Sequence, residues 1–332
     1  MVLVDKENFG GNMREELHKI CDDFLEKREM ISEIFAWYNA RLYPVCAEIT
    51  LDKQDITKEK ILQCKKLVEE NTNVFSEVRG NAFPVVVSYL ACEQNPKDLM
   101  EEILKIYKKI RTAGIPSGYL SVVAVILAVF GDEKDYDAMI GKTRELYGRM
   151  RAEHPFLTTG EDSPFAAMLA VDSKDAQMIA QEVEQCYKFL KGNFFSKNAV
   201  QSLSHVLAMG EEDALEKCRR FMDLYNTFKM KGYQFDTEYY LPVLGAASLI
   251  PMDINEMVED VIALASYLEG KPGFGLLNIT KKEIMAHATI IVCKEYLSRC
   301  IGQVLDAAMF SATVAGITTA IVMQTTAVGI LT

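Results

Sequence analysis

The stretch HPFLTTGEDSPFAAMLA, residues 154–170, shows how two helices are joined in this chain. Before it, apolar residues recur at three- and four-residue spacings, which is the pattern of an amphipathic helix. Within it, Ser163 is a helix-capping residue, and Pro164 fits the first helical position, where no backbone N–H is needed. The acids Glu161 and Asp162 precede the new helix and suit its positive end. The stretch therefore predicts a joint between two helices.

Features of this joint recur along the chain at a nearly constant interval. Tyrosines near the ends of amphipathic helices are 38 to 42 residues apart, at Tyr107, Tyr147, Tyr187, Tyr225 and Tyr267. Apolar residues follow them at intervals of 39 to 41 residues, at Phe75, Ile115, Phe156, Phe195, Phe235 and Phe274. Two-helix units of this length have the size of HEAT-like repeats, which bury their apolar faces by stacking. The sequence predicts an all-α protein, a right- or left-handed α-solenoid of roughly 40-residue repeats. The alternative is an irregular all-helical bundle.

The predicted chain is one continuous structural domain in three parts. Residues 1–80 are expected to form a divergent helical region, and residues 81–275 five two-helix repeats. Residues 276–332 are expected to form a C-terminal capping helix followed by an apolar helical tail. Capping-box sequences at Asp253 (DINE) and Thr280 (TKKE) mark helix starts that agree with this division.

Composition limits the partners and the compartment. The formal net charge of the chain is -11, whereas nucleic-acid binding depends on Lys and Arg neutralising phosphates, so no nucleic-acid partner is predicted. A protein, a peptide or a small ligand remains as the partner, and a homo-oligomer is a further alternative. The eight cysteines form no CxxC pair and most lie among apolar residues, and acids occupy the N-terminus where a secretion signal needs basic residues. These features favour a cytoplasmic protein.

The last 26 residues, 307–332, carry no charge. They are long enough to cross a bilayer, yet five threonines from Thr313 onward and Gln324 make them only moderately apolar. Three interpretations remain: a buried terminal helix, an oligomer contact, or a membrane anchor.

Polar residues of the joint and of the next unit form the main candidate site. In the stretch NAVQSLSHVLAMG, residues 198–210, three polar residues share one helical face. Because neighbouring units stack, this face and the joint are expected to converge. The candidate ligand-binding residues are His154, Thr159, Glu161, Asp162, Asn198, Gln201 and His205. Histidine with a carboxylate can serve acid–base chemistry or hold a single metal ion. The alternative is a purely structural joint in which His205 is a core histidine.

Arg79, at the joint before the first predicted repeat, is a further candidate. Its guanidinium suits an anionic ligand group or a nearby acid, and the alternative is an exposed arginine with no such role. No phosphate-binding loop, dinucleotide fingerprint, nucleophile elbow or HExxH sequence is present, so no catalytic residue, metal centre or cofactor is predicted.

The stretches 154–170 and 198–210 resemble the signature stretches of domain-of-unknown-function family 4003, a bacterial family of uncharacterised helical proteins. VFSEVRGN, residues 74–81, resembles a third, and the resemblance runs from the first helices to about Arg299. The family pattern reads HPFLTG before an acidic pair, whereas here an added threonine, Thr158 or Thr159, enlarges the turn. The resemblance implies a bacterial, cytoplasmic, all-helical protein to which no reaction is assigned.

The sequence therefore favours a helical-repeat scaffold that binds an unidentified ligand over an enzyme. An enzyme with a His and acid site at the joint of residues 154–162, or a protein anchored to a membrane by its tail, are the alternatives.

Overall fold

The computed structural model describes residues 13–298, apart from residues 52, 54, 75, 234–239 and 276–278. In these residues the chain forms fourteen α-helices and three short 3-10 helices. Among them there is no strand beyond an isolated bridge between Gly275 and Ile279. The predicted all-α class is confirmed.

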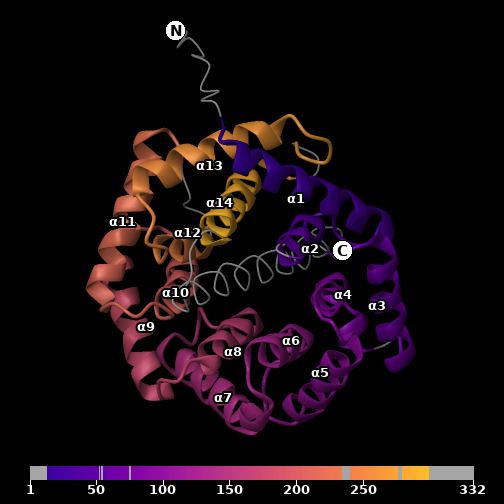
Figure 1. Cartoon of the computed structure of the whole chain (residues 1–332). Coiled ribbons are helices and arrows are strands. Elements are labelled where there is room, and N and C mark those ends of the chain that lie inside the picture. Colours follow the sequence, from indigo (N-terminus) through magenta and orange to yellow (C-terminus); the bar gives the residue numbers. More distant parts are fainter. Residues whose placement is uncertain are drawn as a thin grey trace, which may run out of the picture.

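The helices form two concentric rings (Figure 1). The outer ring consists of α1 (Glu15–Ile34), α3 (Lys58–Asn71), α5 (Pro96–Ile110), α7 (Tyr136–Glu153), α9 (Ala176–Leu190), α11 (Ala214–Met230) and α13 (Ile254–Glu269). The inner ring consists of α2 (Leu42–Thr50), α4 (Phe83–Cys92), α6 (Leu120–Phe130), α8 (Ser163–Val171), α10 (Lys197–Leu207), α12 (Leu241–Ser248) and α14 (Lys281–Ser298). The chain thus alternates between the rings, one outer helix followed by one inner helix.

Residue patterns explain which helices lie inside. In α6 every residue from Leu120 to Ala128 is buried, because neighbours cover the helix on all sides. The outer helix α5 instead buries a stripe at three- and four-residue spacings that includes Leu99, Ile103 and Ile106. Helices that are buried on nearly all sides, such as α6, therefore form the inner ring, and amphipathic helices such as α5 cover them.

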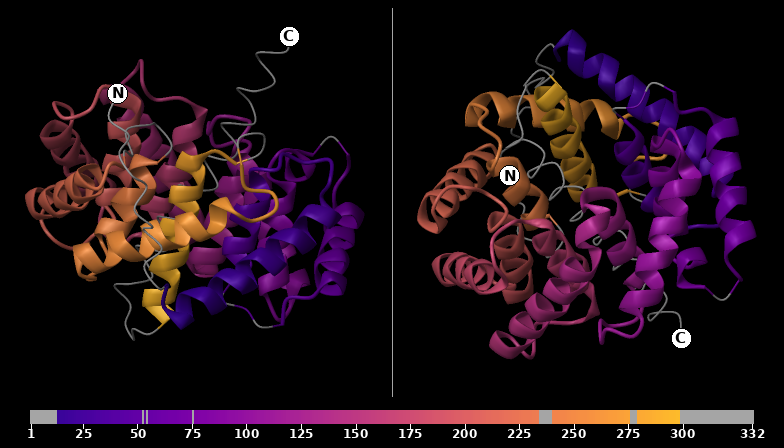
Figure 2. Two further views of the ribbon diagram at one scale, coloured as in Figure 1. Left: turned by 90° about the horizontal axis from the view of Figure 1, so that it is seen from above. Right: turned by 60° about the horizontal axis from the view of Figure 1, so that its bottom comes forward.

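Both rings are closed. α1 packs against α14, and α14 packs against α2. Arg14, next to the start of α1, binds the carboxylates of Asp260 in α13 at 2.6 Å and of Glu295 in α14 at 3.2 Å. The predicted solenoid would leave its two ends apart, whereas here the rotation from pair to pair brings the last helices back to the first (Figure 2).

The helix connections lie on two sides of the ring. Inner helices such as α4 and α6 are seen nearly end-on in Figure 1, so they run along the ring axis. Described outer-to-inner connections also contact their neighbours, since Gly118 donates to Glu77 and Asn198 donates to Glu161. The described connections of this kind therefore share one side, which we call the joint face, and the inner-to-outer turns lie on the other. The recurring tyrosines occupy the last two turns of successive outer helices: Tyr107 in α5, Tyr147 in α7, Tyr187 in α9, Tyr225 in α11 and Tyr267 in α13.

Some predictions fall outside the described residues. These are the apolar tail 307–332 and the markers Phe75 and Phe235. Within the described part, no helix combines the length and the apolar character needed to span a membrane. The Thr280 capping box is confirmed, because the Thr280 backbone donates to the Glu283 carboxylate at 2.6 Å and the Glu283 backbone donates to the Thr280 hydroxyl at 3.3 Å.

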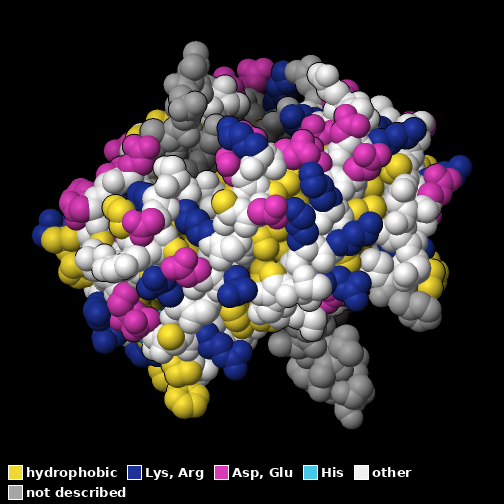
Figure 3. Space-filling view, turned by 90° about the horizontal axis from the view of Figure 1, so that it is seen from below, with side chains coloured by type: hydrophobic (Ala, Val, Ile, Leu, Met, Phe, Trp, Pro, Cys, Tyr) yellow, Lys and Arg dark blue, Asp and Glu magenta, His cyan; other side chains and the backbone are white. Residues whose placement is uncertain are grey.

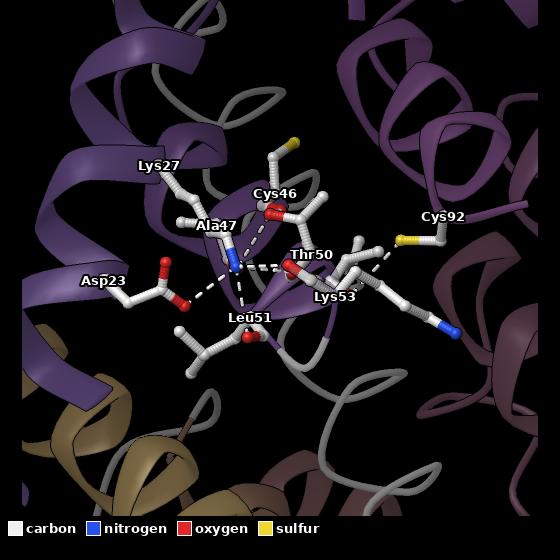
Figure 4. A network of polar contacts seen from close by, with 9 residues as sticks. Asp23, Lys27, Cys46, Ala47, Thr50, Leu51, Lys53 and Cys92 are labelled. Atoms are coloured by element: carbon white, nitrogen blue, oxygen red, sulfur yellow. Dashed lines mark hydrogen bonds and ion pairs between the residues drawn. The ribbon is translucent and has the colours of Figure 1, made fainter. Parts of the chain in front are cut away.

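A buried lysine of α1 closes the end of the inner helix α2 (Figure 4). Lys27 is 5% exposed, and its ammonium donates to the backbone carbonyls of Thr50 at 3.0 Å, Leu51 at 3.1 Å and Lys53 at 2.8 Å. Its counter-ion is Asp23, one turn earlier, at 2.8 Å. The last carbonyls of a helix have no partner within the helix and carry its negative pole, so a cation here satisfies both requirements.

The same arrangement recurs around the ring. In α7, Lys142 donates to the carbonyls of Asp172 and Lys174 after α8. In α11, Lys217 donates to the carbonyl of Gly210 after α10, and Arg220 donates to carbonyls after α12. Outer-ring cations therefore join the two rings at the side opposite the joint face.

Candidate functional site

The joint of residues 154–162 is capped by Thr159 and Asp162. The Thr159 backbone N–H donates to Oδ2 of Asp162 at 2.8 Å, and the Thr159 hydroxyl accepts from the backbone of the following 3-10 helix η3 (Gly160–Asp162). The prediction that Ser163 caps the helix is wrong, because Ser163 is already the first residue of α8 and donates to the Gly160 carbonyl at 2.7 Å. The cap of the joint is therefore Thr159, and Asp162 is buried behind it.

His205 projects from α10 toward this buried carboxyl group. Its Nδ1 lies 3.8 Å from Oδ1 of Asp162, too far for a hydrogen bond, and the exposed fraction of each side chain is 1%. Among the residues that the structure describes, neither ring nitrogen of His205 has a hydrogen-bond partner. The ring lies beside Phe165 of α8, with 5.6 Å between centroids. A buried imidazole with two unused nitrogens is uncommon in proteins and calls for a specific account.

Burial keeps both groups uncharged. Desolvation raises the pKa of Asp162 to about 7, although the hydrogen bond from the Thr159 backbone acts in the opposite direction. Desolvation lowers the pKa of His205 to about 3, with a smaller contribution in the same direction from His154. Between these two pH values neither group is ionised, so their proximity is not an ion pair.

His154 lies at the mouth of a small cavity that reaches His205. Its Nε2 is 2.9 Å from Oε2 of Glu184 in α9, and its ring packs on Tyr187 with 4.3 Å between centroids. About 340 Å³ of empty space, open solvent included, lies in and in front of the cavity, and the cavity itself has room for a group of about the size of one water. Its lining includes the apolar Leu146, Met150 and Val183 as well as the polar His154, Glu184 and His205.

The other residues of the predicted stripe hold the joint in place. Gln201 is buried and donates to the Thr158 hydroxyl at 2.9 Å, and Thr158 in turn donates to the Met150 carbonyl at 3.0 Å. Oε1 of Gln201 has no partner. Asn198 donates to Oε1 of Glu161 at 3.2 Å at the outer side of the joint. The stripe therefore has different roles along its length, and only its last residue, His205, lines the cavity.

Arg79 lies apart from this cluster. It ends the 3-10 helix η1 (Glu77–Arg79), which packs against α3, α4 and α6, and its side chain is part-exposed. Sequence reasoning missed Glu184 and Thr158. Glu184 lies one turn before the recurring Tyr187, and this spacing, which places both side chains on the face toward the joint, is the signal that could have identified it.

The arrangement suits hydrogen bonding rather than metal binding. Among the residues that the structure describes, no group of three or more His, Cys, Asp and Glu side chains is placed to hold a metal ion. A proton on Nδ1 of His205 would face Asp162 and leave Nε2 as an acceptor. Together with the Glu184 carboxylate, this makes the cavity accepting in character.

Replacing Gln201 by leucine should lower the free energy of unfolding by about 1–2 kcal/mol, because the buried Thr158 hydroxyl loses its donor. Urea titration measures the loss. Replacing Asn198 by alanine should cost below about 0.5 kcal/mol, since its partner Glu161 is accessible to solvent. Equal costs for the two variants would contradict the role assigned to Gln201.

Comparison with known proteins places the chain in a family without assigning an activity. A family model described as protein of unknown function (DUF4003) matches residues 29–326. The uncharacterized protein YeaA of Bacillus subtilis (strain 168) is 21% identical over 167 residues, which is 49% of this chain and 50% of that protein. The match thus spans about half the length of that curated relative. No solved structure matches.

Proposed function

The chain belongs to the DUF4003 family, and we propose that it is a helical-repeat binding protein whose ligand enters the cavity between α7, α9 and α10. Each outer and inner helix pair is one repeat of this scaffold. The observation that carries the proposal is His205, which lines the cavity, is wholly buried, and has two ring nitrogens without a partner among the described residues. A polar ligand group would supply the missing hydrogen bond, since buried polar groups without partners destabilise a fold.

The cavity favours the hydroxyl or amino end of a small ligand. Nε2 of His205 and the Glu184 carboxylate accept hydrogen bonds, and Leu146, Met150 and Val183 exclude water around them. An anionic group is disfavoured, because Glu184 and Glu153 line the cavity, whereas the guanidinium of Arg149, which also lines it, is paired with Glu145 at 2.8 Å. The seven cysteines of the described residues are free thiols, which supports a cytoplasmic setting for this binding.

The test measures the melting temperature with ethanolamine, glycerol and formate as probes. Ethanolamine or glycerol should raise it by about 3 °C at saturating concentration, and formate should leave it unchanged. His205→Phe should abolish the shift and keep the helical circular dichroism. His287→Phe is the matched control, because His287 is also a buried inner-ring histidine but is bonded to Glu48 at 2.7 Å, and its shift should match that of the wild type.

A crystal structure of the protein with ethanolamine should show the probe against His205. The proposal would be contradicted if the crystal structure showed only an ordered water against His205 and no probe changed the melting temperature.

An enzyme is the second candidate, and it rests on Asp162 and His205. Two perturbed groups, one acid and one base, 3.8 Å apart beside a cavity are a common feature of proton-transfer sites. For this reading the Asp162→Asn variant should keep ligand binding and lose turnover, whereas for a binding protein it should leave the probe-induced shift unchanged.

A further inference from the structure

Large apolar side chains are exposed mainly on the joint face. Trp37, Phe156 and Phe195 are 100%, 96% and 103% exposed, and each lies in an outer-to-inner connection. Phe189 and Met230 are exposed in the last turns of α9 and α11, directly before such connections. The exposed apolar residues elsewhere, Leu62, Met178 and Leu215, lie in the first two turns of outer helices and are 37% to 55% exposed. The most exposed residues therefore share one side of the ring.

The backbone holds these side chains outward. Phe194 is buried against Tyr225, with 5.0 Å between centroids, so the neighbouring Phe195 points to solvent. Lys197 fixes the same connection by donating to the carbonyls of Lys191 and Phe194. At the preceding connection, the backbone of Thr158 donates to the His154 carbonyl at 2.9 Å, and Phe156 lies at the tip of that turn.

Cations surround the four neighbouring apolar residues Phe156, Phe189, Phe195 and Met230, which we call the apolar patch. The exposed basic residues next to it are Arg151, Lys188, Lys191, Lys229 and Lys231. Lys188 and Lys231 pair with Glu184 and Glu259, whereas no ion pair is found for Arg151, Lys191 and Lys229 among the described residues. With Glu153 as the exposed acid beside Phe156, the surroundings of the patch are still mainly basic, on a chain whose net charge is -11.

The opposite side of the ring is acidic. The turns before α7, α9 and α11 carry runs such as Asp132 to Asp137 and Glu211 to Asp213. In Figure 3 basic and acidic side chains are mixed over the visible side of the ring, several acidic groups lie toward the upper border, and a hydrophobic group projects at the lower edge. Helix polarity explains part of this separation of charge, since acids suit helix starts and cations suit helix ends. It does not explain exposed phenyl rings between the cations.

We propose that the joint face docks on the surface of a bilayer rich in anionic phospholipids. Phe156 and Phe195 would insert at the level of the headgroups, and Arg151, Lys191 and Lys229 would contact lipid phosphates. Phe156 and Phe195 lie on separate connections of the same face of the ring, so a flat and deformable surface can contact both of them. A folded protein partner would need a matching pocket for each ring. This inference is independent of the His205 cavity.

The test is co-sedimentation of the full chain with vesicles of phosphatidylcholine alone or with about 30% phosphatidylserine. Binding is expected only to the vesicles with phosphatidylserine, and it should weaken steeply with added salt. The single tryptophan, Trp37, lies on the same face, so its emission should shift to shorter wavelength on binding and be quenched by brominated lipid.

Two sets of variants separate the apolar and ionic contributions. Phe156→Ser with Phe195→Ser should weaken binding at least about tenfold, since both rings are exposed and the fold does not need them. Arg151→Gln, Lys191→Gln and Lys229→Gln together should weaken it about a hundredfold, at about fivefold per charge. Leu62→Ser with Met178→Ser, on the other side of the ring, is the control and should bind as the wild type does.

Three outcomes would overturn the proposal. Binding that survives both sets of substitutions would come from another part of the chain. Equal binding to neutral vesicles would remove the role of the cations. Binding to soluble polyglutamate but to neither kind of vesicle would identify an acidic protein surface as the partner instead.

Discussion

Replacing Lys27 by methionine should lower the free energy of unfolding by about 3 kcal/mol. The change keeps the aliphatic stem and removes the ammonium group that bonds to three carbonyls at the end of α2 (Figure 4). Thr50 and Leu51 are buried, so water cannot take over these bonds fully. Urea unfolding followed by circular dichroism measures the loss, and the melting temperature should fall with it.

Lys66→Met is the matched control for this substitution. Lys66 pairs with Glu70 at 3.5 Å on the surface of α3, with 75% of its side chain exposed. An exposed pair one helical turn apart contributes about 0.3–0.5 kcal/mol, so the control should change stability by no more than that. Similar losses for the two variants would show that the buried lysine does not close the end of α2.

The second large effect is a pair of opposite pH dependences at Asp162 and His205. The raised pKa of Asp162, about 7, means that the folded state binds its proton more tightly than the unfolded state does. The contribution of Asp162 to the free energy of unfolding is fully present below the unfolded pKa of about 3.9 and is lost as pH rises through about 7. The lowered pKa of His205, about 3, acts in the other direction. The contribution of His205 to the free energy of unfolding is fully present above about pH 6.5 and is lost as pH falls through about 3.

In the wild type these two dependences should largely cancel between about pH 4 and pH 6.5. His205→Phe leaves Asp162 alone, so stability relative to the wild type should fall as pH rises through this window. Asp162→Asn leaves His205 alone and keeps an oxygen acceptor for the Thr159 backbone, so relative stability should rise with pH. For each variant, the slope of the free energy of unfolding against pH, relative to the wild type, approaches about 1.4 kcal/mol per pH unit. This amounts to a few kcal/mol across the window.

Thr143→Val serves as the control for the pH series. It alters a buried hydroxyl that bonds to the Met139 carbonyl at 2.8 Å and has no titrating group, so its stability should run parallel to that of the wild type. Slopes of the same sign for His205→Phe and Asp162→Asn would contradict the assignment of an uncharged acid beside an uncharged imidazole.

The sequence predicts the helices better than their arrangement. The apolar stripe of α5 indicates an outer helix that is buried on one side, and the uninterrupted apolar run of α6 indicates an inner helix that is buried on all sides. Closure of the ring depends on the small rotation from one pair to the next. That rotation is set by packing between side chains far apart in sequence, such as Arg14 and Asp260, which are 246 residues apart.

The candidate site was predictable in part for the same reason. His154, Asp162 and His205 belong to one joint and the next unit, and stacking of neighbours places His154 and His205 at one cavity and Asp162 3.8 Å from His205. The sequence suggests Ser163 as the cap instead of Thr159, because the short 3-10 helix of Gly160–Asp162 before α8 has no periodic pattern to reveal it. Lys27 was overlooked, although a cation beside the buried stripe of Phe24 and Ile31 is a signal that its charge is satisfied inside the fold.

The closed rings also constrain the order in which this chain acquires its structure. Arg14 and Glu295 are 281 residues apart, so the contacts that join α1 to α14 form only after nearly all the helices exist. While the chain is still being synthesised, the apolar side of α1 that α14 covers is therefore exposed. Local helix pairs such as α5 and α6 assemble early. Completion of the ring is therefore a late, cooperative step, and a nascent chain stalled before α14 presents an apolar surface to chaperones.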